Sequence, residues 1–213
     1  MYAKFFKRAL DFVLSLLAII VLSPFLLIFT IIGAIAMKGN PFFIQKRPGK
    51  IDKNTGKERI LNLIKFRSMS NAKDENGKLL PNKERLNKYG RIIRALSIDE
   101  LPSLVNILIG DISIIGPRPL TITYLDYYTE EERRRHEVRP GLTGLAQCMG
   151  RNNLSWEEKF AYDVEYVDNV SFALDVKILF KTVLSVLKRE GIGQGEKQPV
   201  SLHIERADMH LKS

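Results

Sequence analysis

Cysteine, histidine and tryptophan are scarce in this chain of 213 residues, which has one cysteine, three histidines and one tryptophan. A single cysteine, Cys148, excludes an intramolecular disulfide framework and suits a reducing compartment. The histidines are scattered and lack the spacing of a zinc site. The sequence also has no Walker loop, no Rossmann glycine pattern and no internal repeat, so the common nucleotide-binding motifs are missing.

Acidic residues are in the minority. Lysine and arginine number 33 against 24 aspartates and glutamates, which gives a net charge of +9 and a pI of about 9.6. This balance favours an anionic partner: nucleic acid, acidic membrane lipid or a phosphorylated substrate. The length corresponds to one ordinary domain with a small addition, enough to build a hydrophobic core.

Charge is absent from residues 12–37, and Lys4, Lys7 and Arg8 precede this apolar segment. As one straight helix it would extend over about 39 Å, more than the roughly 30 Å of a bilayer core. The run is too long for the apolar part of a cleavable signal peptide. We therefore expect a membrane anchor.

Two topologies fit this anchor equally well. Ser23 and Pro24 lie at its middle, where proline removes a backbone hydrogen bond and bends a helix. Basic residues flank both ends, so the positive-inside rule draws both ends toward the cytoplasm. A re-entrant helix, broken at Ser23-Pro24 and returning through one leaflet, satisfies both observations. A spanning helix with a mild kink is the alternative.

The sequence after Met37 is mixed and globular. Strand-like runs at 42–44 and 60–66 flank a turn-rich stretch, which predicts a β-hairpin. Apolar residues at helical spacing predict a buried helix over 101–109, ended by Gly110. Ser155 and Glu158 form a plausible capping box. The remaining expectations are a solvated charged run at 130–135, a helix with an apolar stripe at 176–187 for the core or a membrane surface, and a loose tail from residue 191.

Two adjacent carboxylates, Asp99 and Glu100, lie at the predicted start of the buried helix. The helix dipole and nearby Arg94 favour an ionised carboxylate there. An ionised aspartate facing a basic pocket can act as a nucleophile toward phosphorus. The structural alternative is that Asp99 is the N-cap, since Pro102 then falls among backbone positions that need no intrahelical donor. Ser97 and Glu100 also fit a capping box, but with Pro102 badly placed.

Several basic residues are candidates for phosphate binding. Pro117 and Pro119 fix the backbone on both sides of Arg118, which holds one guanidinium at low entropic cost and suits bidentate phosphate recognition. Lys65, on the second predicted strand, either binds phosphate or lies at a solvated edge. Arg151 lies in a predicted turn and is a further candidate.

Together these motifs resemble the bacterial sugar transferase family of small monotopic phosphoglycosyl transferases, which start glycoconjugate assembly on polyprenyl phosphate. The resemblance covers nearly all of residues 1–190 and is specific, because several uncommon motifs occur in the family's order. The matching motifs are the basic N-terminus, Ser23-Pro24, Gln45-Lys46-Arg47-Pro48-Gly49, Lys65-Phe66-Arg67-Ser68-Met69, Ser97-Ile98-Asp99-Glu100-Leu101-Pro102, Gly116-Pro117-Arg118-Pro119, Arg139-Pro140-Gly141-Leu142-Thr143-Gly144 and Gly150-Arg151.

The resemblance implies an α+β fold on the cytoplasmic face of the bacterial inner (plasma) membrane. Residues 1–38 would form a re-entrant membrane helix broken at Ser23 and Pro24. Residues 39–190 would form the catalytic domain, with amphipathic interfacial helices around a β-hairpin. Residues 191–213 match no family motif and are expected to be a flexible tail.

The resemblance also implies a two-step reaction. Asp99 would attack the β-phosphate of a UDP-sugar and release UMP, and undecaprenyl phosphate would then take the phosphosugar. Glu100 would be a general acid/base or a metal-orienting partner, and Mg²⁺ would bind Asp99 and the diphosphate, in keeping with the preference of Mg²⁺ for carboxylates and phosphates. The family's substrate-binding positions correspond to Lys65, Arg94, Pro117, Arg118, Pro119 and Arg151. The expected partners are the UDP-sugar, undecaprenyl phosphate and membrane lipid, without nucleic acid.

Other functions remain open on the sequence alone. A non-enzymatic basic module at the membrane would explain the charge and the anchor, but not the acidic pair followed by a proline-flanked arginine. A transferase of a nucleotide or alcohol phosphate is a second alternative. A glycosidase is disfavoured, because adjacent carboxylates cannot act from opposite faces of a glycosidic bond. No motif identifies the sugar, the pathway or the oligomeric state.

Overall fold

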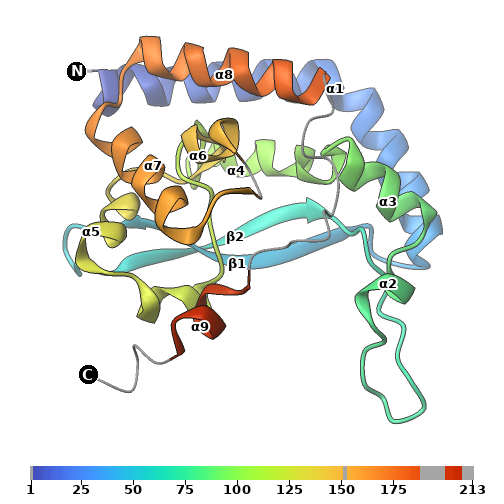
Figure 1. Ribbon diagram of the computed structural model, residues 1–213. Coiled ribbons are helices and arrows are strands. Elements are labelled where there is room, and N and C mark those ends of the chain that lie inside the picture. The colour runs from blue at the N-terminus through green and yellow to red at the C-terminus, as the bar shows by residue number, and fades with distance from the viewer. Residues whose placement is uncertain (1, 151–152, 188–199, 208–213) are drawn as a thin grey trace.

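The computed structural model describes residues 2–150, 153–187 and 200–207, which form a mixed α and β structure (Figure 1). Helices lie above and beside a long β-hairpin that crosses the middle of the molecule. The elements are η1 (Tyr2–Phe6), α1 (Lys7–Met37), β1 (Phe42–Ile51), β2 (Glu58–Phe66), α2 (Asn82–Arg85), α3 (Lys88–Ala95), η2 (Ile98–Ser103), α4 (Leu104–Ile109), β3 (Ser113–Ile115), η3 (Ile122–Tyr127), α5 (Glu130–Arg133), η4 (Arg134–Glu137), β4 (Gly141–Thr143), α6 (Leu145–Met149), α7 (Trp156–Asp168), α8 (Phe172–Leu187) and α9 (Leu202–Glu205).

The predicted β-hairpin is confirmed, with strands longer than the sequence pattern indicated. β1 and β2 pair antiparallel, with Phe42 opposite Phe66 and Arg47 opposite Leu61. Side chains alternate between the two faces of a strand, so Leu61, Leu63 and Lys65 share one face of β2. η2 and α4 cover this face.

α4 joins the hairpin through a hydrophobic core and through one buried amide. Leu61 and Leu63 pack with Leu104, Ile107 and Ile112 in one core cluster. Gly110 ends α4 in the left-handed region with φ of 90°, as predicted.

Asn106 of α4 occupies the edge of β2 that β1 leaves unpaired. Its Oδ1 accepts from the Ile64 N–H at 3.0 Å, and its Nδ2 donates to the Asn62 carbonyl at 2.8 Å. The Ser103 hydroxyl also donates to the Ile64 carbonyl at 2.8 Å, so Asn106 and Ser103 together take the place of a third strand at this edge.

α1 is a single helix with Pro24 inside it, and it changes direction partway along (Figure 1). Both of its ends contact the domain: Arg8 donates to the Ile107 and Leu108 carbonyls at 2.7 Å, and Asn87 donates to the Ala36 carbonyl at 3.1 Å. By its length and composition, α1 is long and apolar enough to cross a membrane, and only 6% of its most apolar 18-residue stretch is buried in the structure.

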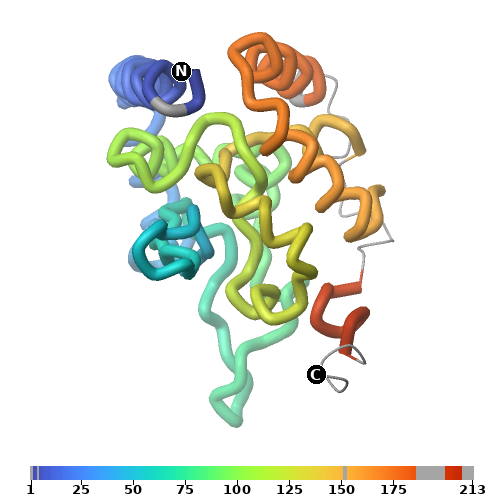
Figure 2. The backbone as a smooth tube through the Cα atoms, turned by 90° about the vertical axis from the view of Figure 1, so that its left-hand side faces the viewer, coloured from blue at the N-terminus to red at the C-terminus, as the bar shows by residue number. Residues whose placement is uncertain are grey.

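α8 lies at the same end of the molecule as α1 (Figures 1 and 2). Lys7 joins the two helices through an ion pair of 2.7 Å with Asp175. Ile178 packs into the core beside Tyr166, whereas most of the predicted apolar stripe points outward. The exposed members are Val176, Leu179, Phe180, Val183 and Leu184. This stripe therefore belongs to the surface of the molecule.

Two expectations about the rest of the chain differ from the structure. The charged run at 130–135 is not simply solvated, because Arg135 is only 2% exposed and binds the buried Asp163. Of the segment expected to be a flexible tail, residues 191–199 and 208–213 lie outside the described residues. Residues 200–207 are packed against the domain, with Leu202 fully buried.

We predict that Asn106→Ala lowers the free energy of unfolding by about 2–4 kcal/mol, because the Ile64 N–H and the Asn62 carbonyl of β2 lose their hydrogen bonds to the amide. Denaturant unfolding in detergent measures the change. Ile109→Ala is the matched control on the same helix, since Ile109 is 62% exposed and should shift the free energy by less than about 0.5 kcal/mol. Equal effects of the two substitutions would contradict the role of Asn106.

Candidate functional site

Glu100 lies between two cations that come from distant parts of the chain. Lys65 of β2 donates to its Oε1 at 2.8 Å. Arg118, in the loop after β3, approaches both carboxylate oxygens, at 2.6 Å and 3.4 Å. The Glu100 and Lys65 side chains are each 17% exposed, and Arg118 is 45% exposed. Glu100 and Lys65 are therefore largely buried, and Arg118 is the partner that reaches the surface.

The charges of this cluster set the protonation of Glu100. Burial by itself would raise its pKa, but Arg118 and Lys65 outweigh burial and lower the pKa to about 2. Burial lowers the pKa of Lys65, against the attraction of Glu100. Without substrate, Glu100 is thus ionised near neutral pH and too weak a base to take up a proton readily. In this state the Glu100 carboxylate accepts hydrogen bonds from Lys65 and Arg118 and thereby fixes their positions.

Asp99 is in the opposite situation. Its carboxylate makes no hydrogen bond or ion pair with any residue that the structure describes. Burial raises its pKa, and neighbouring Glu100 adds to this effect, whereas Lys65, Arg94 and Arg118 oppose it. Asp99 is thus a half-buried carboxylate surrounded by cations, with its oxygens free for a substrate.

The structural alternative for Asp99, a helix N-cap, is contradicted by the structure. η2 is a 3-10 helix that begins at Ile98, so Asp99 lies inside its first turn. Ser97 precedes the helix in the left-handed region with φ of 55°, and its side chain makes no capping hydrogen bond. The capping-box alternative is therefore also wrong, and neither carboxylate is explained by capping.

Arg47 completes the cluster and was not among the predicted site residues. It lines a small pocket of about 40 Å³ together with Lys65, Glu100 and Arg118. Its Nε is buried and has no hydrogen-bond partner among the described residues. Burial and the charge of Arg118 lower its pKa. The sequence indicated Arg47 only as part of the Gln45–Gly49 motif. Its pairing with Leu61 shows that its side chain lies on the same face of the hairpin as Lys65.

The Gly116–Pro119 loop is held through its backbone. Arg135 donates from Nη2 to the Arg118 carbonyl at 2.7 Å, and the Gly141 N–H donates to the Pro117 carbonyl at 2.9 Å. Pro119 lines the same small pocket. The arginine that holds Glu100 thus projects from a loop fixed on both sides.

Comparison with known proteins identifies the family of the chain. The model of the family described as "Bacterial sugar transferase" matches residues 2–189. The chain belongs to the bacterial sugar transferase family. It is 51% identical to the sugar transferase EpsL of Bacillus subtilis over 189 residues, which are 88% of this chain and 90% of EpsL.

Two further relatives of the family carry names that state a reaction. The Salmonella typhimurium protein is called undecaprenyl-phosphate galactose phosphotransferase and is 34% identical over 89% of this chain. The Aeromonas hydrophila protein is called UDP-N-acetylgalactosamine-undecaprenyl-phosphate N-acetylgalactosaminephosphotransferase and is 35% identical over 86% of this chain. The chain spans less than half of these two relatives, 42% and 44% of their lengths.

The structure thus brings together Lys65, Asp99, Glu100 and Arg118. Arg94 stays outside the small pocket: it is exposed and donates from Nε to the Ser68 hydroxyl at 2.7 Å, although its charge acts on Asp99. Arg151 lies outside the described residues.

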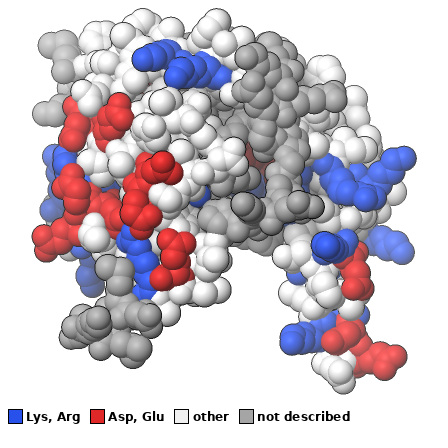
Figure 3. Space-filling view, in the orientation of Figure 1, with Lys and Arg blue, Asp and Glu red and all other residues white. Residues whose placement is uncertain are grey.

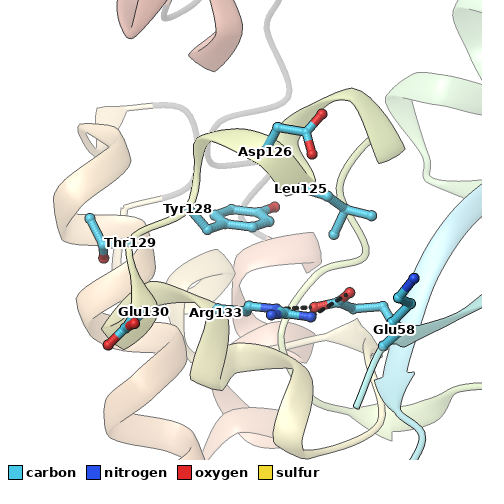
Figure 4. Close-up of a pocket in the computed structure, with 8 residues that line it drawn as sticks. Glu58, Leu125, Asp126, Tyr128, Thr129, Glu130 and Arg133 are labelled. Carbon is cyan, nitrogen blue, oxygen red and sulfur yellow. Dashed lines mark hydrogen bonds and ion pairs between the residues drawn. The ribbon is translucent and has the colours of Figure 1, made fainter. Parts of the chain in front are cut away.

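A larger hollow of about 470 Å³ lies elsewhere, near the tip of the hairpin (Figure 4). Arg133 and Glu58, two of its lining residues, are joined by an ion pair of 2.6 Å. Glu58 is roughly 23 Å along β2 from Lys65. The hollow is therefore remote from the acidic pair, and its ion pair gives it no strong preference for an anion.

We predict that Glu100 makes the free energy of unfolding depend on pH in the acidic range. Its pKa of about 2 lies below the ordinary 4.5, so ionised Glu100 stabilises the fold above pH 4.5, and this contribution is lost as the pH falls toward 2. Between about pH 6 and pH 3 the natural protein should lose about 2 kcal/mol more free energy of unfolding than Glu100→Gln. Denaturant unfolding across this range measures the difference.

Asp126→Asn is the control, because Asp126 is exposed. Its acid profile should follow that of the natural protein. A Glu100→Gln profile with the same acid loss would show that the contacts with Lys65 and Arg118 do not stabilise the ionised carboxylate.

Proposed function

We propose that this protein transfers a phosphosugar from a UDP-sugar to undecaprenyl phosphate, releasing UMP, as the first membrane step of glycoconjugate biosynthesis. The observation that carries the proposal is the difference between the two adjacent carboxylates: two cations hold Glu100, whereas Asp99 has no hydrogen-bond or ion-pair partner among the described residues. The names of the Salmonella and Aeromonas relatives support the same reaction class.

In the proposed first step, a carboxylate oxygen of Asp99 attacks the β-phosphorus of the UDP-sugar. The bond from this phosphorus to the bridging oxygen breaks, and UMP leaves with the bonding electrons. The sugar phosphate is then joined to Asp99 as an acyl phosphate. In the second step, a phosphate oxygen of undecaprenyl phosphate attacks the same phosphorus, and the Asp99 carboxylate leaves. The products are undecaprenyl-diphosphosugar and the free enzyme.

The cations have a direct role in this reaction. Lys65, Arg118 and Arg47 line the small pocket at Glu100. Asp99 is not one of its lining residues, but it precedes Glu100 in the chain and the charges of Lys65 and Arg118 act on it. These cations are therefore placed to stabilise negative charge on the transferred phosphoryl group and the leaving UMP. Arg118 presents a fork that suits two phosphate oxygens. When phosphate draws Lys65 and Arg118 away from Glu100, the pKa of Glu100 rises, so a proton-transfer role for Glu100 belongs to the substrate complex.

Magnesium fits the donor set, with substrate as the main ligand. Among the described residues, no group of three or more His, Cys, Asp or Glu side chains comes together. Asp99 supplies one free carboxylate, and Mg²⁺ commonly uses one or two carboxylates plus substrate phosphates. Bound there, the ion would neutralise charge on the diphosphate.

The membrane arrangement that we propose is a re-entrant α1 on the cytoplasmic leaflet of the inner membrane. One domain holds both Arg8 at the start of α1 and Ala36 at its end, which supports two ends on one side of the bilayer. Pro24 lies between them. The exposed stripe of α8, at the same end of the molecule, would face the lipid. Figure 3 shows Lys and Arg at this end and on the flank with α3, and acidic residues gathered on the flank with α5. Basic residues at this end suit anionic headgroups.

We predict that Asp99→Asn lowers UMP release by more than about 10³-fold and abolishes the phosphosugar adduct, because an amide is not a nucleophile toward phosphorus. UMP release is measured with a panel of UDP-sugars in the presence of undecaprenyl phosphate and Mg²⁺, and the adduct is measured by mass spectrometry of the intact protein. Chelation with EDTA should stop release. Asp126→Asn is the matched control and should stay active. Normal turnover by a folded Asp99→Asn protein would overturn the proposed function.

We predict that cysteines placed at Tyr2 and Asn40 both react with an impermeant maleimide only from the cytoplasmic side, because α1 returns to the leaflet that it enters. Cys148→Ser provides the background, since the chain has no other cysteine. Labelling of intact spheroplasts is compared with that of inverted vesicles. Reaction from opposite sides would mean that α1 spans the bilayer.

A further inference from the structure

Residues 200–207, which we name the C-terminal clamp, lie beyond the family match at 2–189 but are packed on the domain. Leu202 has no exposed surface and sits in an aromatic cluster. The buried members of that cluster are Tyr124 of η3 and Trp156 and Phe160 of α7. The Trp156 indole N–H donates to the Val200 carbonyl at 2.8 Å. Figure 1 shows α9, the helical turn of the clamp, below the hairpin.

Arg206 fastens the clamp through charge. Its guanidinium binds both oxygens of Glu132, at 2.6 Å and 2.8 Å, and Glu157 at 2.9 Å. It also donates to the Tyr127 carbonyl at 2.9 Å. The side chain is only 8% exposed, and charge-assisted, bidentate contacts of this kind are the stronger ones. The clamp thus ties η3, α5 and α7 together.

The same aromatic cluster supports the residue that fixes the Arg118 loop. The guanidinium carbons of Arg206 and Arg135 each lie 5.6 Å from the centre of the Phe160 ring. Arg135 also lies 5.6 Å from the Tyr128 ring and binds Asp163 at 2.7 Å. From this buried position it donates to the Arg118 carbonyl. A continuous path of contacts thus leads from the clamp to Arg118.

We infer that the C-terminal clamp positions the Arg118 loop, with Leu202 and Arg206 as its positioning residues. Leu202 packs into the aromatic cluster, and Arg206 binds η3, α5 and α7, the elements around this cluster. Phe160 and Tyr128 then keep Arg135 in place behind Arg118. This inference rests on the proposed function only where Arg118 is taken to bind the UDP-sugar. Small displacements of such a group can cost up to about a hundredfold in rate.

The experiment compares Leu202→Ala and Arg206→Gln in the full chain with two controls. Ile204→Ala removes a side chain of the same helix that is 60% exposed. Leu202→Met keeps the volume of the buried side chain. Trp156 is the only tryptophan, so quenching of its fluorescence by acrylamide reports directly on clamp docking. Kinetics of UMP release give kcat and KM for the UDP-sugar.

Leu202→Ala and Arg206→Gln should increase the quenching of Trp156 and lower kcat/KM about tenfold, chiefly through KM. Ile204→Ala and Leu202→Met should behave as the natural protein. Loss of folded protein would lower the apparent kcat and leave KM unchanged. A rise in KM therefore distinguishes a misplaced Arg118 loop from a loss of stability. Arg206→Gln preserves the buried leucine and serves if Leu202→Ala does not fold.

Unchanged quenching would overturn the docking, and increased quenching with unchanged KM would overturn the positioning role. If the natural protein releases no UMP, the proposed function fails and a different readout decides the clamp. A displaced Arg118 would bring the pKa of Glu100 closer to its ordinary value, so the Glu100-dependent acid loss of stability would be smaller in Leu202→Ala. An acid loss of unchanged size would then overturn the inference.

Discussion

The hold of Lys65 and Arg118 on Glu100 is the interaction on which the site depends. Two adjacent carboxylates repel each other, and in a half-buried setting one of them would tend to take up a proton. The two cations remove this conflict by keeping Glu100 ionised, with a pKa of about 2. Asp99 is left without a partner in the described part of the chain. The surroundings thus shift the pKa values of two neighbouring acids in opposite directions, a common way in which proteins distinguish two like groups.

The hairpin makes this hold possible. Lys65 reaches Glu100 because η2 lies across the face of β2 that carries Leu61 and Leu63, and Asn106 fixes α4 to the free edge of the same strand. Arg118 arrives from the other side on its proline-flanked loop, whose backbone Arg135 holds. The same fold holds both ends of α1, so the apolar helix and the acidic pair with its cations belong to one domain.

Much of the framework was predictable because its signals are local. Turn residues between two apolar runs predicted the hairpin, and Gly110 predicted the end of α4. The capping box at Ser155 is present, since its Oγ accepts from the Glu158 N–H at 3.2 Å. Each of these features depends on residues a few positions apart, whose backbone preferences survive in almost any surroundings.

The sequence by itself determined the apolar anchor, the hairpin and the order of motifs that carries the family, because composition and short-range spacing encode them. Only the tertiary structure decided which of Asp99 and Glu100 is free, that Arg47 joins the site, that Arg135 is buried, and that residues 200–207 are packed on the domain. These features depend on groups far apart in the chain, brought together by burial and charge. Asp99 and Glu100 are neighbours in every local pattern, and what separates them is the pair of cations that folding places around one of them.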